Sequence, residues 1–164
     1  MGSSADPALT VLAWGNASRG DDAIGPLLAE RLRATMPTGL SVIEDHQLNI
    51  EHVMDLDSDG AALFIDASVD ITEGYRLQRI VPSHDGNFST HAISPQALLN
   101  VFEQTIGQPA PESWLLHVAA QEFELGAAPG EVAKAAIEAA DQFLQDLLQR
   151  PTDEWRDCLR QASS

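Results

Sequence analysis

The stretch Thr10–Leu28, TVLAWGNASRGDDAIGPLL, changes its pattern twice along its length. It opens within an apolar run, Leu9–Trp14, which is short and apolar enough for a buried strand. Small residues then interrupt the pattern, and from Ile24 onward apolar side chains recur with helical spacing. The stretch therefore predicts a strand, a loop and a helix, with Asp21 and Asp22 where the loop becomes the helix.

The two adjacent carboxylates cannot face the same way. We expect Asp21 to cap the helix and Asp22 to point into the crevice that forms beyond the carboxyl ends of parallel strands. The local pattern alone is also that of an ordinary capped helix. A third carboxylate, Asp66, stands at an equivalent place after a later apolar strand, and this favours the functional interpretation.

Size and charge limit the class of protein. The 164 residues predict a single domain over residues 1–150, followed by a polar C-terminal tail over residues 151–164 that could hold one amphipathic turn around Trp155 and Leu159. A formal net charge of −16 speaks against nucleic acid and anionic membranes as partners. The lone cysteine, Cys158, excludes an internal disulfide framework and a cysteine-based zinc cluster. With no signal-peptide pattern and no apolar run long enough for a bilayer, we expect a cytoplasmic protein.

Strand patterns and helix patterns alternate along the chain. We predict strands at Leu9–Trp14, Leu40–Glu44, Ala61–Ile65, Tyr75–Val81 and Trp114–Ala119, and helices at Asp22–Ala34, Asn49–Leu56, Pro95–Ile106 and Glu131–Gln149. The alternation predicts the α/β class: a three-layer sandwich with a mainly parallel five-stranded sheet and helices on both faces. The fourth strand follows the third without a helix and partly alternates polar with apolar residues, so we expect it to be an antiparallel edge strand.

Three side chains are candidates for one metal site. Asp22 lies beyond the first strand, Asp66 ends the third, and His91 precedes a helix. Because adjacent strands lie ~4.8 Å apart, side chains from such ends can meet. Two carboxylates and an imidazole would suit a divalent transition metal with open coordination positions. From the pattern alone, Asp66 could instead satisfy backbone N–H groups, and His91 could be solvated.

The remaining candidates have weaker patterns. Asp45 closes the second strand and either lines the same crevice or faces solvent. We expect His117, inside the fifth strand, to be a hydrogen-bonded core residue rather than a ligand. The other histidines carry no motif and are expected at the surface: His46, His52 and His84.

The segment GNASRGDDAIGP, residues 15–26, resembles the signature of the [NiFe]-hydrogenase maturation endopeptidases. In that family an apolar strand is followed by Gly-Asn, a short loop, an acidic pair and a glycine. The later parts follow in order: Asp45 at the end of the second strand, Asp66 in FIDA and His91 in STHAISPQALL. The resemblance spans about Val11 to Leu148. The combination of SRGDD, HAISP and EFELG looks most like the branch serving soluble or bidirectional NAD-linked hydrogenases.

The resemblance implies an activity and roles for individual residues. It implies an endopeptidase that removes the C-terminal extension of a hydrogenase large-subunit precursor, after nickel has been installed in that precursor. Asp22, Asp66 and His91 match the catalytic, metal-contacting positions, whereas Asn16 and Asp45 become candidate substrate contacts. Nickel would arrive with the substrate. Two departures stand out: His-Gln-Leu follows Asp45 where some relatives have Gly-Gly-Thr, and Asp22 stands where many have Glu.

Two alternatives of other classes remain. A receiver-like signalling domain also carries an acidic pair after its first strand and an Asp ending its third, but the lysine typical of its fifth strand is missing from LLHVAAQEF. A non-catalytic metal-binding or chaperone module of the same fold would bind the precursor without shortening it. The sequence also does not decide whether nickel takes part in hydrolysis or only positions the precursor while a carboxylate activates water.

Overall fold

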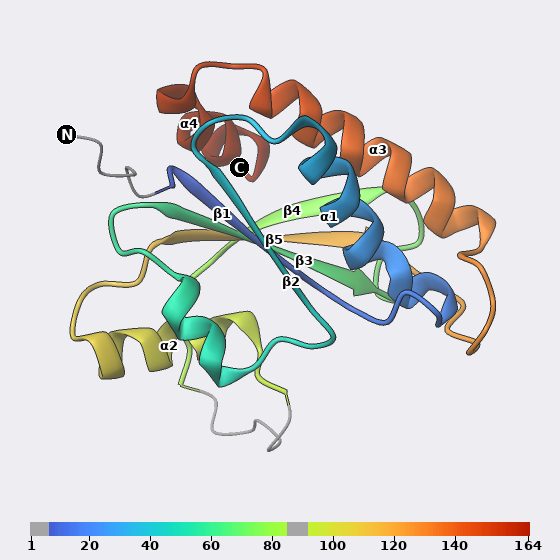
Figure 1. Ribbon diagram of the computed structural model, residues 1–164, viewed down its shortest axis with the longest axis horizontal. Helices are drawn as coiled ribbons and strands as arrows, with labels where there is room; N and C mark the ends of the chain where they lie inside the picture. The colour runs from blue at the N-terminus through green and yellow to red at the C-terminus, as the bar shows by residue number, and fades with distance from the viewer. Residues whose placement is uncertain (1–6, 85–91) are drawn as a thin grey trace.

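A five-stranded sheet forms the centre of the computed structural model, which describes residues 7–84 and 92–164 (Figure 1). The strands are β1 (Leu9–Trp14), β2 (Leu40–Asp45), β3 (Ala61–Ser68), β4 (Tyr75–Ile80) and β5 (Glu112–Ala119). Their order in the sheet is β2-β1-β3-β5-β4. All neighbours are parallel except β4, which runs antiparallel to β5 at the edge. The predicted α/β class and the antiparallel edge strand are confirmed.

Helices cover both faces of this sheet. One face carries α1 (Ile24–Thr35), α3 (Glu131–Leu148) and α4 (Trp155–Ala162); the other carries α2 (Pro95–Ile106) and the 3-10 helix η2 (Ile50–Asp55) (Figure 1). Successive strand residues point to opposite faces, so a strand covered on both sides is apolar throughout. In β3, Leu63 packs in the core beneath α1 and α3, whereas Phe64 packs beneath α2 and η2.

The contact between α1 and β1 depends on Gly25. A Cβ atom at this position would overlap the backbone of Trp14, including its carbonyl oxygen. The first turn of α1 therefore lies against the end of β1 more closely than any residue with a side chain allows. Leu28 and Leu32 continue the buried face of the helix, and both are fully inaccessible to solvent.

Two helical segments differ from the sequence prediction. The expected helix from Asp22 is divided into a 3-10 turn, η1 (Gly20–Ala23), followed by α1. The segment predicted as a helix over Asn49–Leu56 is the 3-10 helix η2, in which the Asn49 side chain accepts a hydrogen bond from the backbone of Glu51. Residue spacing over a single turn does not separate the two helix types, since both place residues three apart on one side.

Residues 151–164, expected as a polar tail, fold instead into the short η3 (Thr152–Glu154) and α4. Trp155 and Leu159 are buried against the core, and Arg160 makes two hydrogen bonds of 2.7 Å to Glu112 on β5. The sequence indicated at most one amphipathic turn around these two residues, because the apolar stripe of the helix is narrow and most of its other residues are polar or charged. Within the described ranges, no helix combines the length and the hydropathy that a bilayer span requires.

Candidate active site

Asp21 serves to join two loops. Its side chain is completely buried and accepts hydrogen bonds from the backbone N–H groups of Gln121 (2.6 Å), Glu122 (2.8 Å) and Gly130 (2.8 Å). The expectation that Asp21 caps α1 is wrong, because the carboxylate uses these donors from the β5–α3 connection and makes no cap hydrogen bond. Three N–H donors compensate the buried charge.

Backbone hydrogen bonds reinforce this junction. They join the β1–η1 loop to the β5–α3 connection at three places: Asp21 N–H to Glu122 O, Gly20 N–H to Ala127 O, and Gly126 N–H to Ser18 O. The Arg19 side chain adds a fourth bond, from its Nε to Phe123 O. Segments about a hundred residues apart in the chain therefore form one unit, and Asp22 stands on it.

The Asp22 side chain is held at the carboxyl end of β1. Its Oδ2 accepts a hydrogen bond of 2.8 Å from the backbone N–H of Asn16, whose own side chain accepts one from Ser18 N–H. Gly15 makes this turn possible: its φ of 145° suits glycine, and a Cβ there would overlap the backbone carbonyl of Asp22. Asp22 thus lies where the sequence predicts it.

Asp66 lies close enough to Asp22 for the two charges to interact. Burial raises the pKa of Asp66 from 3.8 to about 6, and the negative charge of Asp22 adds to the increase. Asp66 belongs to β3, which continues to Ser68 rather than ending before the aspartate. The structure thus places two of the three predicted ligands within electrostatic range of each other.

The third predicted ligand, His91, lies outside the described residues. Within residues 7–84 and 92–164, no three His, Cys, Asp or Glu side chains form a group able to hold a metal. Asp22 and Asp66 are carboxylates that repel each other, and a positive charge near them would reduce that repulsion.

Asp45 lies at the end of β2, next to the β1–η1 loop. Its backbone carbonyl accepts a hydrogen bond from Gly15 N–H, and its Oδ1 accepts one of 2.7 Å from His46 N–H. A pocket of about 350 Å³ adjoins it, lined by Gly15, Ala17, Pro26, Arg33, Glu44, Asp45 and His46. Asp45 therefore borders a cavity that begins at the same loop that holds Asp22.

His52 is buried, which corrects the expectation that it lies at the surface. It is 6% exposed; its Nδ1 accepts a hydrogen bond of 3.0 Å from Asn49 N–H, and its Nε2 lies 3.3 Å from Asp45 Oδ2. The spacing of Asn49 and His52 is that of a reciprocal helix cap, and this was the signal in the sequence. His46 and His84 are exposed as predicted, and His117 is hydrogen-bonded, with its Nε2 2.8 Å from Gln78 Oε1.

The strand register aligns five side chains in a row across the sheet. Trp14 on β1 pairs with Asp45 on β2. On its other side β1 pairs with β3, where Leu12 lies opposite Phe64; two residues further along both strands, Trp14 and Asp66 are therefore neighbours. His117 pairs with Asp66 on one side and with Arg76 on the other. We call this the cross-sheet row; from β2 to β4 its members are Asp45, Trp14, Asp66, His117 and Arg76.

The cross-sheet row lies on the same face as α2 and η2. The residues two positions earlier in the parallel strands belong to the core on that side: Ile43, Leu12, Phe64 and Leu115. The row itself is more open, since Asp45 and Arg76 are exposed and the three members between them are partly exposed. Sequence reasoning missed Arg76 and the position of His117 beside Asp66, because only the register places them there.

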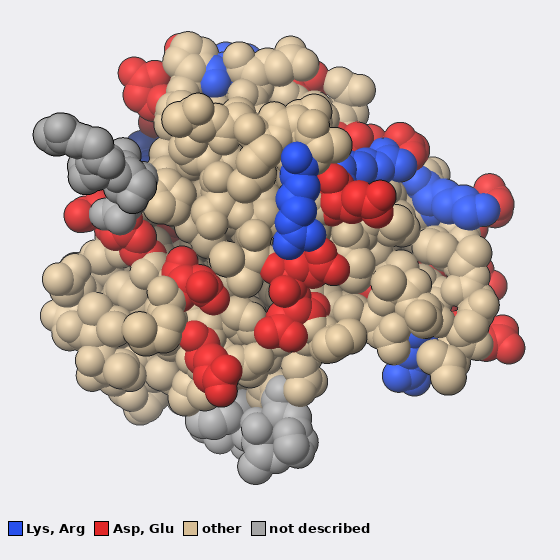
Figure 2. Space-filling view, in the orientation of Figure 1, with Lys and Arg blue, Asp and Glu red and all other residues tan. Residues whose placement is uncertain are grey.

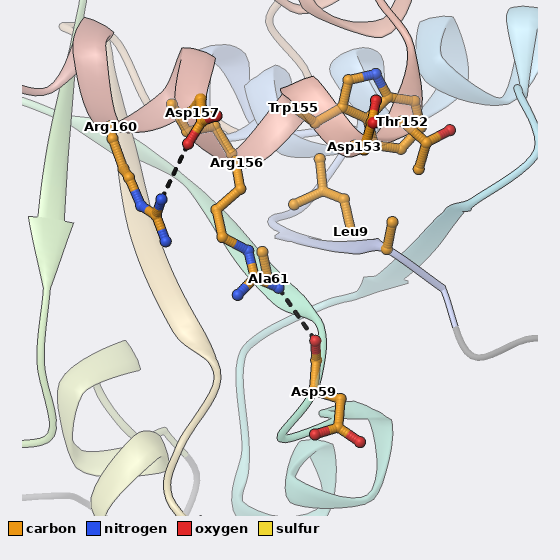
Figure 3. Close-up of a pocket in the computed structure, with 11 residues that line it drawn as sticks. Leu9, Asp59, Ala61, Thr152, Asp153, Trp155, Arg156, Asp157 and Arg160 are labelled. Atoms are coloured by element: carbon orange, nitrogen blue, oxygen red, sulfur yellow. Dashed lines mark hydrogen bonds and ion pairs between the residues drawn. The ribbon is translucent and has the colours of Figure 1, made fainter.

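A pocket elsewhere on the molecule does not coincide with these carboxylates. This pocket, of about 480 Å³, lies at the amino ends of β1 and β3, beneath α4 (Figure 3). Its polar groups contact one another: Arg156 donates to the carbonyl of Asp59, and Arg160 donates to Asp157 (Figure 3). In parallel α/β sheets the binding crevice lies at the opposite, carboxyl ends of the strands, where Asp22 and Asp66 are found.

Comparison with solved structures defines the fold class. No protein-family model and no curated protein matches the sequence. Among solved structures, the [NiFe] hydrogenase maturation protease HycI from Thermococcus kodakarensis KOD1 superimposes with a TM-score of 0.66 at 21% identity, covering 89% of this chain and 95% of that one. At such identity the likeness establishes the fold, an α/β sandwich shared with hydrogenase maturation proteases.

Two further structures have the same fold. The hydrogenase maturating endopeptidase HybD from E. coli matches with a TM-score of 0.63 at 19% identity, over 86% of this chain and 91% of that one. The hydrogenase 2 maturation peptidase from Thaumarchaeota archaeon SCGC_AB-539-E09 matches with a TM-score of 0.58 at 22% identity, over 86% and 97%. The chain therefore spans nearly the whole length of these proteins.

Proposed function

We propose that the protein is an endopeptidase that removes the C-terminal extension of a nickel-loaded [NiFe]-hydrogenase large-subunit precursor. The convergence of Asp22 and Asp66 at the carboxyl ends of β1 and β3 is the observation that carries the proposal. Its context supports it: the signature in residues 15–26, and a fold shared with solved hydrogenase maturation proteases. A cytoplasmic location and the NAD-linked branch belong to the same proposal.

In this proposal the two carboxylates have separate environments. Asp22 is fixed by the Asn16 N–H group and by the loop junction that Asp21 holds. Burial raises the pKa of Asp66 to about 6, which leaves the carboxyl group mostly ionised at pH 7 to 8 and near the pKa that suits a general base at neutral pH. Together with His91, they would face the nickel that the precursor brings. Such a divalent ion polarises a carbonyl group and lowers the pKa of bound water.

The test is incubation of the purified protein with nickel-loaded and nickel-free precursor, read by mass spectrometry. We expect loss of the C-terminal extension only from the nickel-loaded form. Asp22→Asn and Asp66→Asn should abolish shortening while circular dichroism stays unchanged. Glu30→Gln, which removes an exposed carboxylate from α1, is the matched control and should process normally.

The outcomes separate the proposal from its alternatives. Binding of the precursor without any loss of mass would identify a chaperone-like module instead of a peptidase. Transfer of a phosphoryl group from acetyl phosphate to Asp66 would identify a receiver-like domain. Normal shortening by either aspartate variant would remove the roles assigned to these side chains.

A further inference from the structure

Arg76 is unusual among the cations of this chain. All nine Lys and Arg residues lie in the described ranges, among 25 acidic residues in the whole sequence. Acidic groups also outnumber basic ones on the face in Figure 2, where most basic groups adjoin acidic ones. Seven cations form ion pairs: Arg31, Arg33, Arg79, Lys134, Arg150, Arg156 and Arg160. Arg19 donates to a backbone carbonyl, whereas Arg76 has no ion-pair partner among the residues described.

Arg76 lies two strands away from Asp66 of the candidate active site, at the same level of the sheet. Arg76 pairs with His117, and His117 pairs with Asp66, so the three side chains share one face and one level of the sheet. Two strand spacings separate Asp66 from Arg76, or roughly 10 Å. A substrate peptide that lies extended across the strands would advance roughly 3.3 Å per residue. About three residues of such a peptide would therefore span the distance from Asp66 to Arg76.

His117 lies between them without adding a second positive charge. Burial lowers the pKa of His117 below 6.5, the charge of Arg76 lowers it further, and Asp70 acts in the opposite direction. The lowered pKa favours the neutral imidazole, and Gln78 holds its Nε2. Asp70 is also close enough to affect His117, but it forms no ion pair with Arg76 within the described part of the chain. Arg76 alone supplies the positive charge at this end of the cross-sheet row.

We infer that Arg76 is a specificity residue, which binds a carboxylate of the peptide substrate about three residues from the bond that is cleaved. The inference rests on the proposed peptidase function. The cross-sheet row carries carboxylates at Asp45 and Asp66 and a cation at Arg76, so a peptide lying along it meets opposite charges at its two ends. The carboxylate is either an acidic side chain of the extension or its terminal carboxyl group.

The first experiment measures kcat and KM for the nickel-loaded precursor with the wild-type protein, Arg76→Gln and Lys134→Gln. Lys134→Gln removes the same charge from an exposed position on α3. We expect Arg76→Gln to raise KM about tenfold or more, the usual effect of losing one charge-assisted hydrogen bond, with kcat changed little. Lys134→Gln should behave as the wild type. Equal values for all three proteins, or equal losses in both variants, would overturn the inference.

The second experiment identifies the carboxylate. One set of precursors has each Asp or Glu of the extension changed singly to Asn or Gln, and another carries two added glycines that displace the terminal carboxylate. One of these changes should reproduce the KM defect in the wild-type protein and cause no further loss with Arg76→Gln. A defect of Arg76→Gln that persists undiminished on every precursor would overturn the inference. Failure of the wild-type protein to shorten any precursor would instead reject the proposed function.

Discussion

Asp66→Asn should stabilise the protein at neutral and alkaline pH. In the wild type, burial and the charge of Asp22 raise the pKa of Asp66 from 3.8 to about 6. Each pKa unit corresponds to ~1.4 kcal/mol, so the ionised carboxylate costs about 3 kcal/mol of unfolding free energy at pH 8. Asparagine has nearly the same shape and no charge, and it removes this cost.

The sign follows from proton binding. A carboxyl group with a raised pKa in the folded state holds its proton more tightly there than in the unfolded chain. Between pH 3.8 and about 6 the folded state binds more protons, so this group makes stability fall as the pH rises through that window. The advantage of Asp66→Asn should therefore be about 1 kcal/mol at pH 4.5 and grow to about 3 kcal/mol above pH 7.

Urea denaturation from pH 4.5 to 8, without added divalent metal and followed by tryptophan fluorescence, measures the difference. Glu30→Gln serves as the control because it lowers the net negative charge equally, from an exposed site on α1. Its stability should follow the wild type at every pH. A constant offset between Asp66→Asn and the wild type across the pH range, or a less stable variant at pH 8, would refute the reasoning.

Three other substitutions test how the site is supported. Asp21→Ala leaves three part-buried N–H groups without their acceptor and should lower the unfolding free energy by about 3–5 kcal/mol in urea denaturation; a loss under about 1 kcal/mol would contradict the joining role. Gly25→Ala should lower the melting temperature, although the same change usually stabilises an exposed helix, because the new Cβ meets the Trp14 backbone. Trp155→Ala should cost about 3–5 kcal/mol of unfolding free energy, whereas a solvated tail would lose nothing.

Elements of secondary structure were largely predictable because the core is layered. Each central strand is buried on both faces, so apolar runs marked β1, β3 and β5, and the alternation in Tyr75–Val81 marked the edge strand β4. The position of Asp22 beyond β1 followed from the same pattern. The ends of strands were harder to predict where polar residues continue the strand. The predicted strand stops at Ile65, but β3 extends past Asp66 to Ser68, because the Asp66 carboxylate lies in the partly exposed cross-sheet row.

Long-range pairings were not predictable from the sequence. The partners of Asp21 lie about a hundred residues away, and a local pattern at Asp21-Asp22 could only indicate a cap. The placement of Arg76 beside His117 depends on strand register, which no single strand specifies. His52 was missed for another reason: its burial depends on the turn that Asn49 begins, and the cap spacing of Asn49 and His52 is the one local signal for that turn. His91 stays a prediction.

The hydrogen bonds between the β1–η1 loop and the β5–α3 connection have a consequence for the order in which the protein folds during synthesis. The acidic pair is encoded near the start of the chain, yet the backbone groups that hold Asp21 belong to residues 121–130. A ribosome adds about a hundred residues after Asp21 before those donors exist. The candidate site therefore cannot take its final shape early in translation, and any fragment that stops before α3 carries Asp21 and Asp22 without the backbone groups that hold Asp21.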